Sequence, residues 1–148
     1  MVVPDWDCRA PDEGRAALLA SLDLAEQQRP PLAVVVGWSL GAYEAVRLGV
    51  GLLSPDREVP QVVGLAGGFG DHPVRGPGLA VPARGRARTR FVLAHGTSDE
   101  AVEFHELAEG ERRLRAAGWP VTTVELETDH AGIVGAVLDP ALGRCTPA

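Results

Sequence analysis

The chain has 148 residues and a formal net charge of −6, with 45% hydrophobic and 23% charged residues. This length fits one domain, expected to span residues 1–148, and the composition is that of a globular protein rather than a disordered one. The negative charge disfavours a nucleic-acid partner or an anionic membrane surface, since both attract cationic proteins. No apolar run reaches the ~20 residues that cross a bilayer.

The two cysteines, Cys8 and Cys145, lie near opposite ends of the chain. Their spacing matches no metal or redox motif, so we expect two free thiols. The first residues lack the basic region and apolar stretch of a secretory signal, which favours a cytoplasmic protein. The sequence contains no metal-ligand cluster and no phosphate-binding glycine loop, and neither a metal nor a cofactor is expected.

The first part of the chain alternates short apolar runs with helical patterns. Val2–Pro4 predicts a strand, and a helix follows that begins near Asp12 and is stopped by Pro30. Residues 32–36 are apolar at every position, which predicts a strand buried on both faces of a parallel sheet. A helix over residues 42–48 follows.

The second part continues this alternation. Three further strands are predicted, at residues 61–66, 90–94 and 121–126. Two helices are predicted, at residues 102–117 and 132–138. Residues 70–88 are rich in Gly, Pro and Arg and contain no convincing element. The order predicts an α/β three-layer sandwich of about five mainly parallel strands with helices on both faces.

Residues 37–41 read Gly-Trp-Ser-Leu-Gly between the apolar strand and the next helix. In a G-x-S-x-G elbow the turn holds the serine in strained geometry with its hydroxyl exposed. The flanking positions must be glycine because a Cβ would collide with a neighbouring strand or helix. The helix then directs N–H groups, such as that of Leu40, at a developing oxyanion. Ser39 is therefore the predicted nucleophile.

A serine nucleophile needs a base, and the base needs an orienting acid. Asp99 follows the strand at 90–94, and His130 follows the strand at 121–126. The carboxyl ends of parallel strands share one edge of a sheet, so these loops can converge on Ser39. Other residues stay open as the acid or the base: Glu127, Asp129 and Asp139, and His72, His95 and His105.

With these residues in place, the sequence resembles the α/β-hydrolase superfamily, in particular its small serine esterases and dienelactone-hydrolase-like members. Residues 95–102 resemble the acid loop of that superfamily, and residues 128–132 resemble its histidine loop. The resemblance implies a serine hydrolase that cleaves a small-molecule carboxylic ester through an acyl-enzyme. An amidase or thioesterase would use the same triad, and a catalytically silent binding or scaffold protein is the alternative from another class.

The sequence departs from that superfamily at its N-terminal side. Full-length members have three or more strands before the nucleophile strand, whereas one is predicted here, so the chain is expected to be N-terminally short or truncated. The backbone of Trp6 or Asp7 is the candidate for the second oxyanion donor. Trp38, Phe69 and His72 are candidates to contact the substrate, although Trp38 could equally pack under the elbow. The open sheet edge makes a homodimer a candidate assembly.

Overall fold

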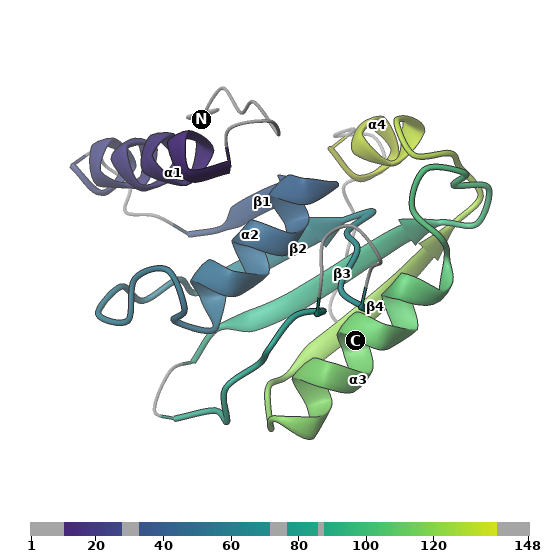
Figure 1. Cartoon of the computed structure of the whole chain (residues 1–148). Helices are drawn as coiled ribbons and strands as arrows, with labels where there is room; N and C mark the ends of the chain where they lie inside the picture. Colours follow the sequence, from purple (N-terminus) through teal and green to yellow (C-terminus); the bar gives the residue numbers. More distant parts are fainter. Residues whose placement is uncertain (1–10, 28–32, 72–76, 86–87, 139–148) are drawn as a thin grey trace.

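A computed structural model describes residues 11–27, 33–71, 77–85 and 88–138 (Figure 1). The described helices are α1 (Pro11–Glu26), α2 (Leu40–Gly49), α3 (His105–Ala116) and α4 (Gly132–Leu138). The described strands are β1 (Val35–Trp38), β2 (Gln61–Leu65), β3 (Arg90–Gly96) and β4 (Val121–Leu126). The predicted strand at Val2–Pro4 lies outside the described residues.

The four described strands form one parallel sheet in the order β1-β2-β3-β4. Because sequential strands are neighbours, each connection crosses back over the sheet, as expected for an α/β protein. The predicted α/β class with parallel strands is confirmed. All four carboxyl ends lie at one edge of the sheet, which is where the predicted site residues follow β1, β3 and β4.

Helices cover both faces of the sheet, as predicted. On one face, a row of paired residues across the strands packs against α2 and α3; the row is Val35, Val62, Phe91 and Val121. On the opposite face, a smaller cluster joins Leu65 and Ala94 to Ile133 of α4. The larger core therefore lies under α2 and α3, while α4 covers the sheet near the carboxyl ends of β2 and β3.

β1 differs from the expectation of a strand buried on both faces. Its residues alternate between buried and exposed: Val35 is 8% exposed, whereas Val36 and Trp38 are 43% and 44% exposed. The reason is its position, because β1 is the edge of the described sheet and α4 packs over β2 and β3 instead. The continuous apolar run thus contributes one face to the core.

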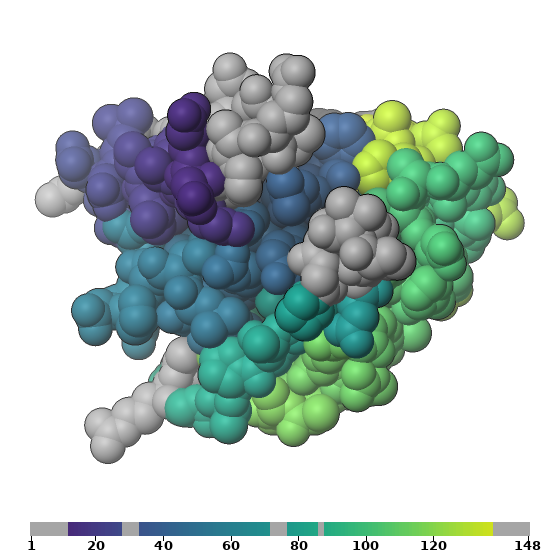
Figure 2. All heavy atoms as spheres, in the orientation of Figure 1, coloured from purple at the N-terminus to yellow at the C-terminus, as the bar shows by residue number. Residues whose placement is uncertain are grey.

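α1 is attached beside α2 by charged side chains as well as by apolar contact. Arg15 of α1 donates two hydrogen bonds to the buried carboxylate of Glu44, of 3.0 and 2.8 Å. Arg57, in the segment after α2, pairs with Asp23 and Glu26 at the other end of α1. In the space-filling view α1 lies against this segment (Figure 2). Leu22 adds the apolar contact to the main core.

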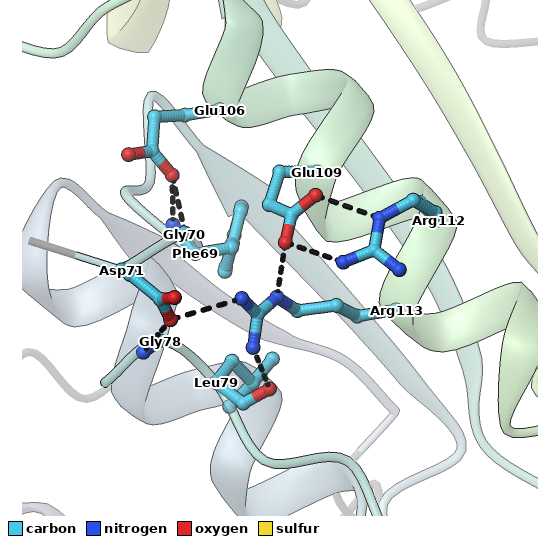
Figure 3. Close-up of polar contacts among 9 residues, drawn as sticks. All are labelled: Phe69, Gly70, Asp71, Gly78, Leu79, Glu106, Glu109, Arg112 and Arg113. Carbon is cyan, nitrogen blue, oxygen red and sulfur yellow. Dashed lines mark hydrogen bonds and ion pairs between the residues drawn. The ribbon is translucent and has the colours of Figure 1, made fainter.

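Arg113 of α3 contacts two parts of the connection between β2 and β3 (Figure 3). Its guanidinium donates to the Leu79 carbonyl at 3.0 Å and to Asp71 Oδ1 at 3.2 Å. Asp71 Oδ1 also accepts the Gly78 N–H, and the Leu79 N–H donates to the Phe69 carbonyl. These bonds hold residues 69–71 and 77–79 side by side.

Candidate active site

Ser39 is the single residue between β1 and α2, so the predicted strand-to-helix turn is present. Its backbone has φ 54° and ψ −121°, a positive-φ conformation that costs a non-glycine residue about 1–3 kcal/mol. The Ser39 N–H donates to the Leu65 carbonyl at 2.8 Å, and its own carbonyl accepts the Ala42 N–H at 3.0 Å. The chain is therefore held in the strained geometry from both sides.

The two glycines of the elbow have different surroundings. A Cβ at Gly37 would lie 2.1 Å from the Gly41 carbonyl oxygen, so only glycine fits beneath the start of α2. A Cβ at Gly41 would have no described atom within 4 Å, apart from its chain neighbours and its own helix backbone. The steric requirement predicted for both glycines is therefore correct for Gly37 and wrong for Gly41, because no described strand lies beyond the edge strand β1.

The Asp99 carboxylate is fully buried in the loop after β3, and both of its oxygens have partners. Oδ1 accepts the N–H groups of Ala101 and Val102, each at 2.9 Å. Oδ2 lies 2.8 Å from Nδ1 of His130. Since a carboxylate accepts hydrogen bonds, Nδ1 of His130 carries a proton directed at Asp99.

Burial and hydrogen bonding act on the pKa of Asp99 in opposite directions. Burial raises the pKa, but the N–H of Val102, the His130 ring and the N–H of Ala101 stabilise the anion. The hydrogen bonds outweigh burial, and the pKa of Asp99 lies below its ordinary value. Asp99 is thus an ionised acceptor at neutral pH.

His95, at the end of β3, supports this carboxylate from its other side. The ring is 1% exposed, and its Nε2 lies 3.0 Å from the Val102 carbonyl and 3.3 Å from Asp99 Oδ2. Both neighbours are acceptors, so Nε2 carries a proton. A buried, engaged ring of this kind is poorly suited to act as the base.

Trp38 brings His130 next to the elbow. The indole Nε1–H donates to the His130 carbonyl at 2.8 Å, across 92 positions of sequence. The two rings also contact, with centroids 5.0 Å apart and planes tilted by 43°. His130 therefore lies beside the residue that precedes Ser39, and its Nε2 is the ring nitrogen not engaged by Asp99.

The alternative acids and bases do not have this arrangement. Asp129 Oδ1 accepts the Gly132 N–H at 2.6 Å at the start of α4. Glu127 is exposed, and His105 is 66% exposed and pairs with Glu103. Asp139 lies outside the described residues.

The remaining predicted site residues lie in the core, at the start of α2 or outside the described residues. Phe69 is 1% exposed, and its ring fills the space beside Gly67 and Gly110, so it packs in the core rather than at the surface. Leu40 begins α2, and first-turn N–H groups have no partner within their own helix. Trp6, Asp7 and His72 lie outside the described residues.

Sequence reasoning did not identify two contacts, His95 with Asp99 and Trp38 with His130. The first joins a residue at the end of β3 to one four positions later in the following loop, and the second ends on a backbone carbonyl. Neither leaves a residue pattern that a single sequence could reveal.

In the described part of the chain, no group of three or more His, Cys, Asp or Glu residues is arranged to hold a metal ion. Among those same residues, no helix combines the length and the apolar character needed to span a membrane.

Among the solved structures with similar folds, three are described as an esterase or as α/β serine hydrolases. Esterase PE8 is 20% identical, with a TM-score of 0.57 over 84% of this chain. An α/β serine hydrolase homologue from Coxiella burnetii is 18% identical, with a TM-score of 0.59 over 86%. XC6422 from Xanthomonas campestris, described as a serine hydrolase without a lid, is 20% identical, with a TM-score of 0.53 over 85%.

This chain spans 58%, 54% and 50% of the lengths of those three proteins, respectively. No family model and no curated protein matches the sequence. The structural likeness shows that the chain has the α/β-hydrolase fold, which confirms the predicted architecture.

Proposed function

We propose that this protein is a serine hydrolase that cleaves small carboxylic esters with Ser39 as nucleophile, His130 as base and Asp99 as orienting acid. The observation that carries the proposal is the 2.8 Å contact between Asp99 and His130, whose loop is bonded to the residue before the strained Ser39 turn. A buried carboxylate, an oriented imidazole and an elbow serine are the parts of an acyl-transfer site.

In the proposed reaction, Ser39 Oγ attacks the ester carbonyl carbon while His130 Nε2 accepts the hydroxyl proton. Asp99 holds the Nδ1 proton and stabilises the imidazolium. The imidazolium then gives its proton to the leaving alkoxide, and the acyl group remains on Ser39. Water, deprotonated by the same imidazole, hydrolyses the acyl-enzyme and restores the serine.

The tetrahedral intermediate needs hydrogen-bond donors for its oxyanion. The backbone N–H of Leu40 is the first proposed donor, because it opens α2 and benefits from the positive end of the helix. The second is proposed to come from the backbone of Trp6 or Asp7. Each donor in such a site contributes about 10²–10³ in rate.

Short acyl groups are the proposed substrates. The connection between β2 and β3, where a helical lid sits in many full-length relatives, has no helix among its described residues. A similar structure is itself described as having no lid. A site without a helical cover offers little apolar surface to a long acyl chain.

A panel of p-nitrophenyl esters of rising chain length tests the proposal, with the Ser39→Ala variant as control. We expect turnover of the acetate and butyrate esters by the wild type, falling with longer chains, and none above background for S39A. If wild type and S39A have equal rates, the chain is instead a silent hydrolase-like binding or scaffold protein. Turnover of p-nitroanilides or thioesters alone would shift the reaction to an amidase or thioesterase.

A further inference from the structure

His130, the proposed base, must reach Ser39 from a strand that lies at the opposite side of the sheet. His130 follows β4, whereas Ser39 follows β1, and β2 and β3 lie between those strands. Neighbouring strands are about 4.8 Å apart, so the two strand ends are separated by about 14 Å. The loop at 127–131 must therefore extend across the sheet edge, and something must fix its far end.

Two contacts hold His130 along this distance. Its Nδ1 lies 2.8 Å from Asp99, which follows β3 and reaches only part of the way. Its carbonyl accepts the indole N–H of Trp38 at 2.8 Å, and its ring lies against the indole. Trp38 is thus the contact that ties the histidine loop to β1 itself.

The exposure of Trp38 argues against a role in the core. Trp38 is 44% exposed, whereas Trp119, the other described tryptophan, is 4% exposed and packs edge-on against Phe91. Trp119 also uses its indole N–H, which donates to the Pro82 carbonyl at 2.9 Å. The two residues make the same kind of bond, but only Trp38 makes it to a site residue.

The indole hydrogen bond also argues against the expectation that Trp38 contacts the substrate. Its one polar atom is committed to the His130 backbone, and part of its ring is covered by the imidazole. Because Trp38 makes these contacts to His130, its main effect should be on the position of His130.

We propose that Trp38 is a positioning residue, which holds His130 over the sheet edge and in line with the Ser39 hydroxyl. This inference rests on the proposed triad. The backbone of Trp38 leads directly into the Ser39 turn, so one residue sets the place of the nucleophile and, through its side chain, of the base. A displacement of about 1 Å at such a site costs on the order of 10² in rate.

The Trp38→Phe variant tests this role, with Trp119→Phe as matched control. Both variants keep an aromatic ring and lose one indole hydrogen bond. For W38F we expect kcat for the preferred p-nitrophenyl ester to fall about 10- to 100-fold with KM unchanged, since only the alignment of the base is lost. W119F should keep the wild-type kcat while its melting temperature falls.

A proton NMR measurement adds a readout that needs no turnover. The Nδ1 proton of His130, bonded to Asp99, should give a resolved downfield signal in the wild type and in W119F. In W38F that signal should broaden or disappear, because the loosened loop exposes the proton to exchange with water. The signal is assigned to His130 by its absence from the spectrum of the His130→Gln variant.

The outcomes separate the two proposals. If the wild type hydrolyses no ester but W38F still loses the Nδ1 signal, the proposed function fails and the positioning role stands. If W38F keeps both the signal and the wild-type kcat, the positioning role is overturned while the proposed function stands. A raised KM with unchanged kcat would also overturn it and return Trp38 to the substrate site.

Discussion

The Asp99 carboxylate explains much of the site at the scale of one residue. Two backbone N–H groups hold one oxygen, and His130 contacts the other, with His95 beside it. The group is buried, yet its pKa lies below the ordinary value because these donors favour the anion. It therefore acts as a fixed acceptor that sets which nitrogen of His130 carries the proton.

Replacing Asp99 by Asn should lower kcat/KM by about 10³–10⁴. The side-chain amide can donate to Nδ1, which moves the imidazole proton to Nε2, where it can no longer accept the serine proton. The measurement is ester hydrolysis, with circular dichroism to verify folding. The matched control is Asp129→Asn, which changes the neighbouring loop aspartate and should keep the wild-type rate; loss of activity in D129N alone would move the acid role to Asp129.

The sequence predicted the position of candidate site residues where a residue of suitable chemistry directly follows a predicted strand. The spacing of Ser39, Asp99 and His130 placed each after a different strand of one sheet, and the structure bonds the last two together. The sequence could not reveal the contact of Trp38 with His130, since a side-chain donor and a backbone acceptor 92 positions apart share no sequence pattern.

At the scale of elements, the junction of β1 and α2 depends on one glycine. Gly37→Ala would place a methyl group 2.1 Å from the Gly41 carbonyl oxygen and should cost about 3 kcal/mol of unfolding free energy or more. Gly41→Ala meets no described atom outside its own helix in the first turn of α2 and should range from neutral to about 1 kcal/mol stabilising. Urea unfolding of both variants measures the difference, and equal costs would contradict this account of the elbow.

The stability contributed by the ion pairs of Glu109 within α3 should depend on pH. The hydrogen bonds of Arg112 and Arg113 with Glu109 lower the pKa of that carboxyl to about 2, although burial opposes them. Because the folded-state pKa is depressed, the stabilisation is complete above the unfolded pKa of 4.5 and is lost as pH falls towards 2.

Glu109→Gln should therefore lower the unfolding free energy at pH 7 by up to about 1 kcal/mol. The difference in unfolding free energy between E109Q and wild type should narrow as pH falls through the interval from 4.5 to about 2. Denaturant unfolding across pH measures it, with Glu111→Gln, which pairs only with Arg115 among described residues, as control. A gap that stays constant with pH would contradict the assigned ion pairs.

At the scale of the whole molecule, periodicity and alternation predicted the parallel sheet and the helices over it. β4 and α4 have the predicted bounds, and the other described elements differ by a few residues at their ends. The burial of β1 could not be predicted in this way. An all-apolar strand is compatible with one or two covered faces. The position of α4, which packs over β2 and β3 and not over β1, decides between them.

The one-sided burial of β1 makes neighbouring valines unequal. Val35→Thr puts a hydroxyl into the main core, where it should cost about 1–3 kcal/mol. Val36→Thr makes the same change on the 43% exposed face and should stay within about 0.5 kcal/mol of wild type. Thermal or urea unfolding compares the two. Similar costs would indicate that the outer face of β1 is covered in solution.

The central claim is that this fold activates Ser39, and covalent trapping tests it most directly. The native protein is incubated with a fluorophosphonate, and the adduct is located by intact mass and peptide mapping, with heat-denatured protein and S39A as controls. The account predicts one adduct per native chain, on Ser39, and none in either control. Native protein that stays unmodified, or that carries the adduct on another residue, would contradict it.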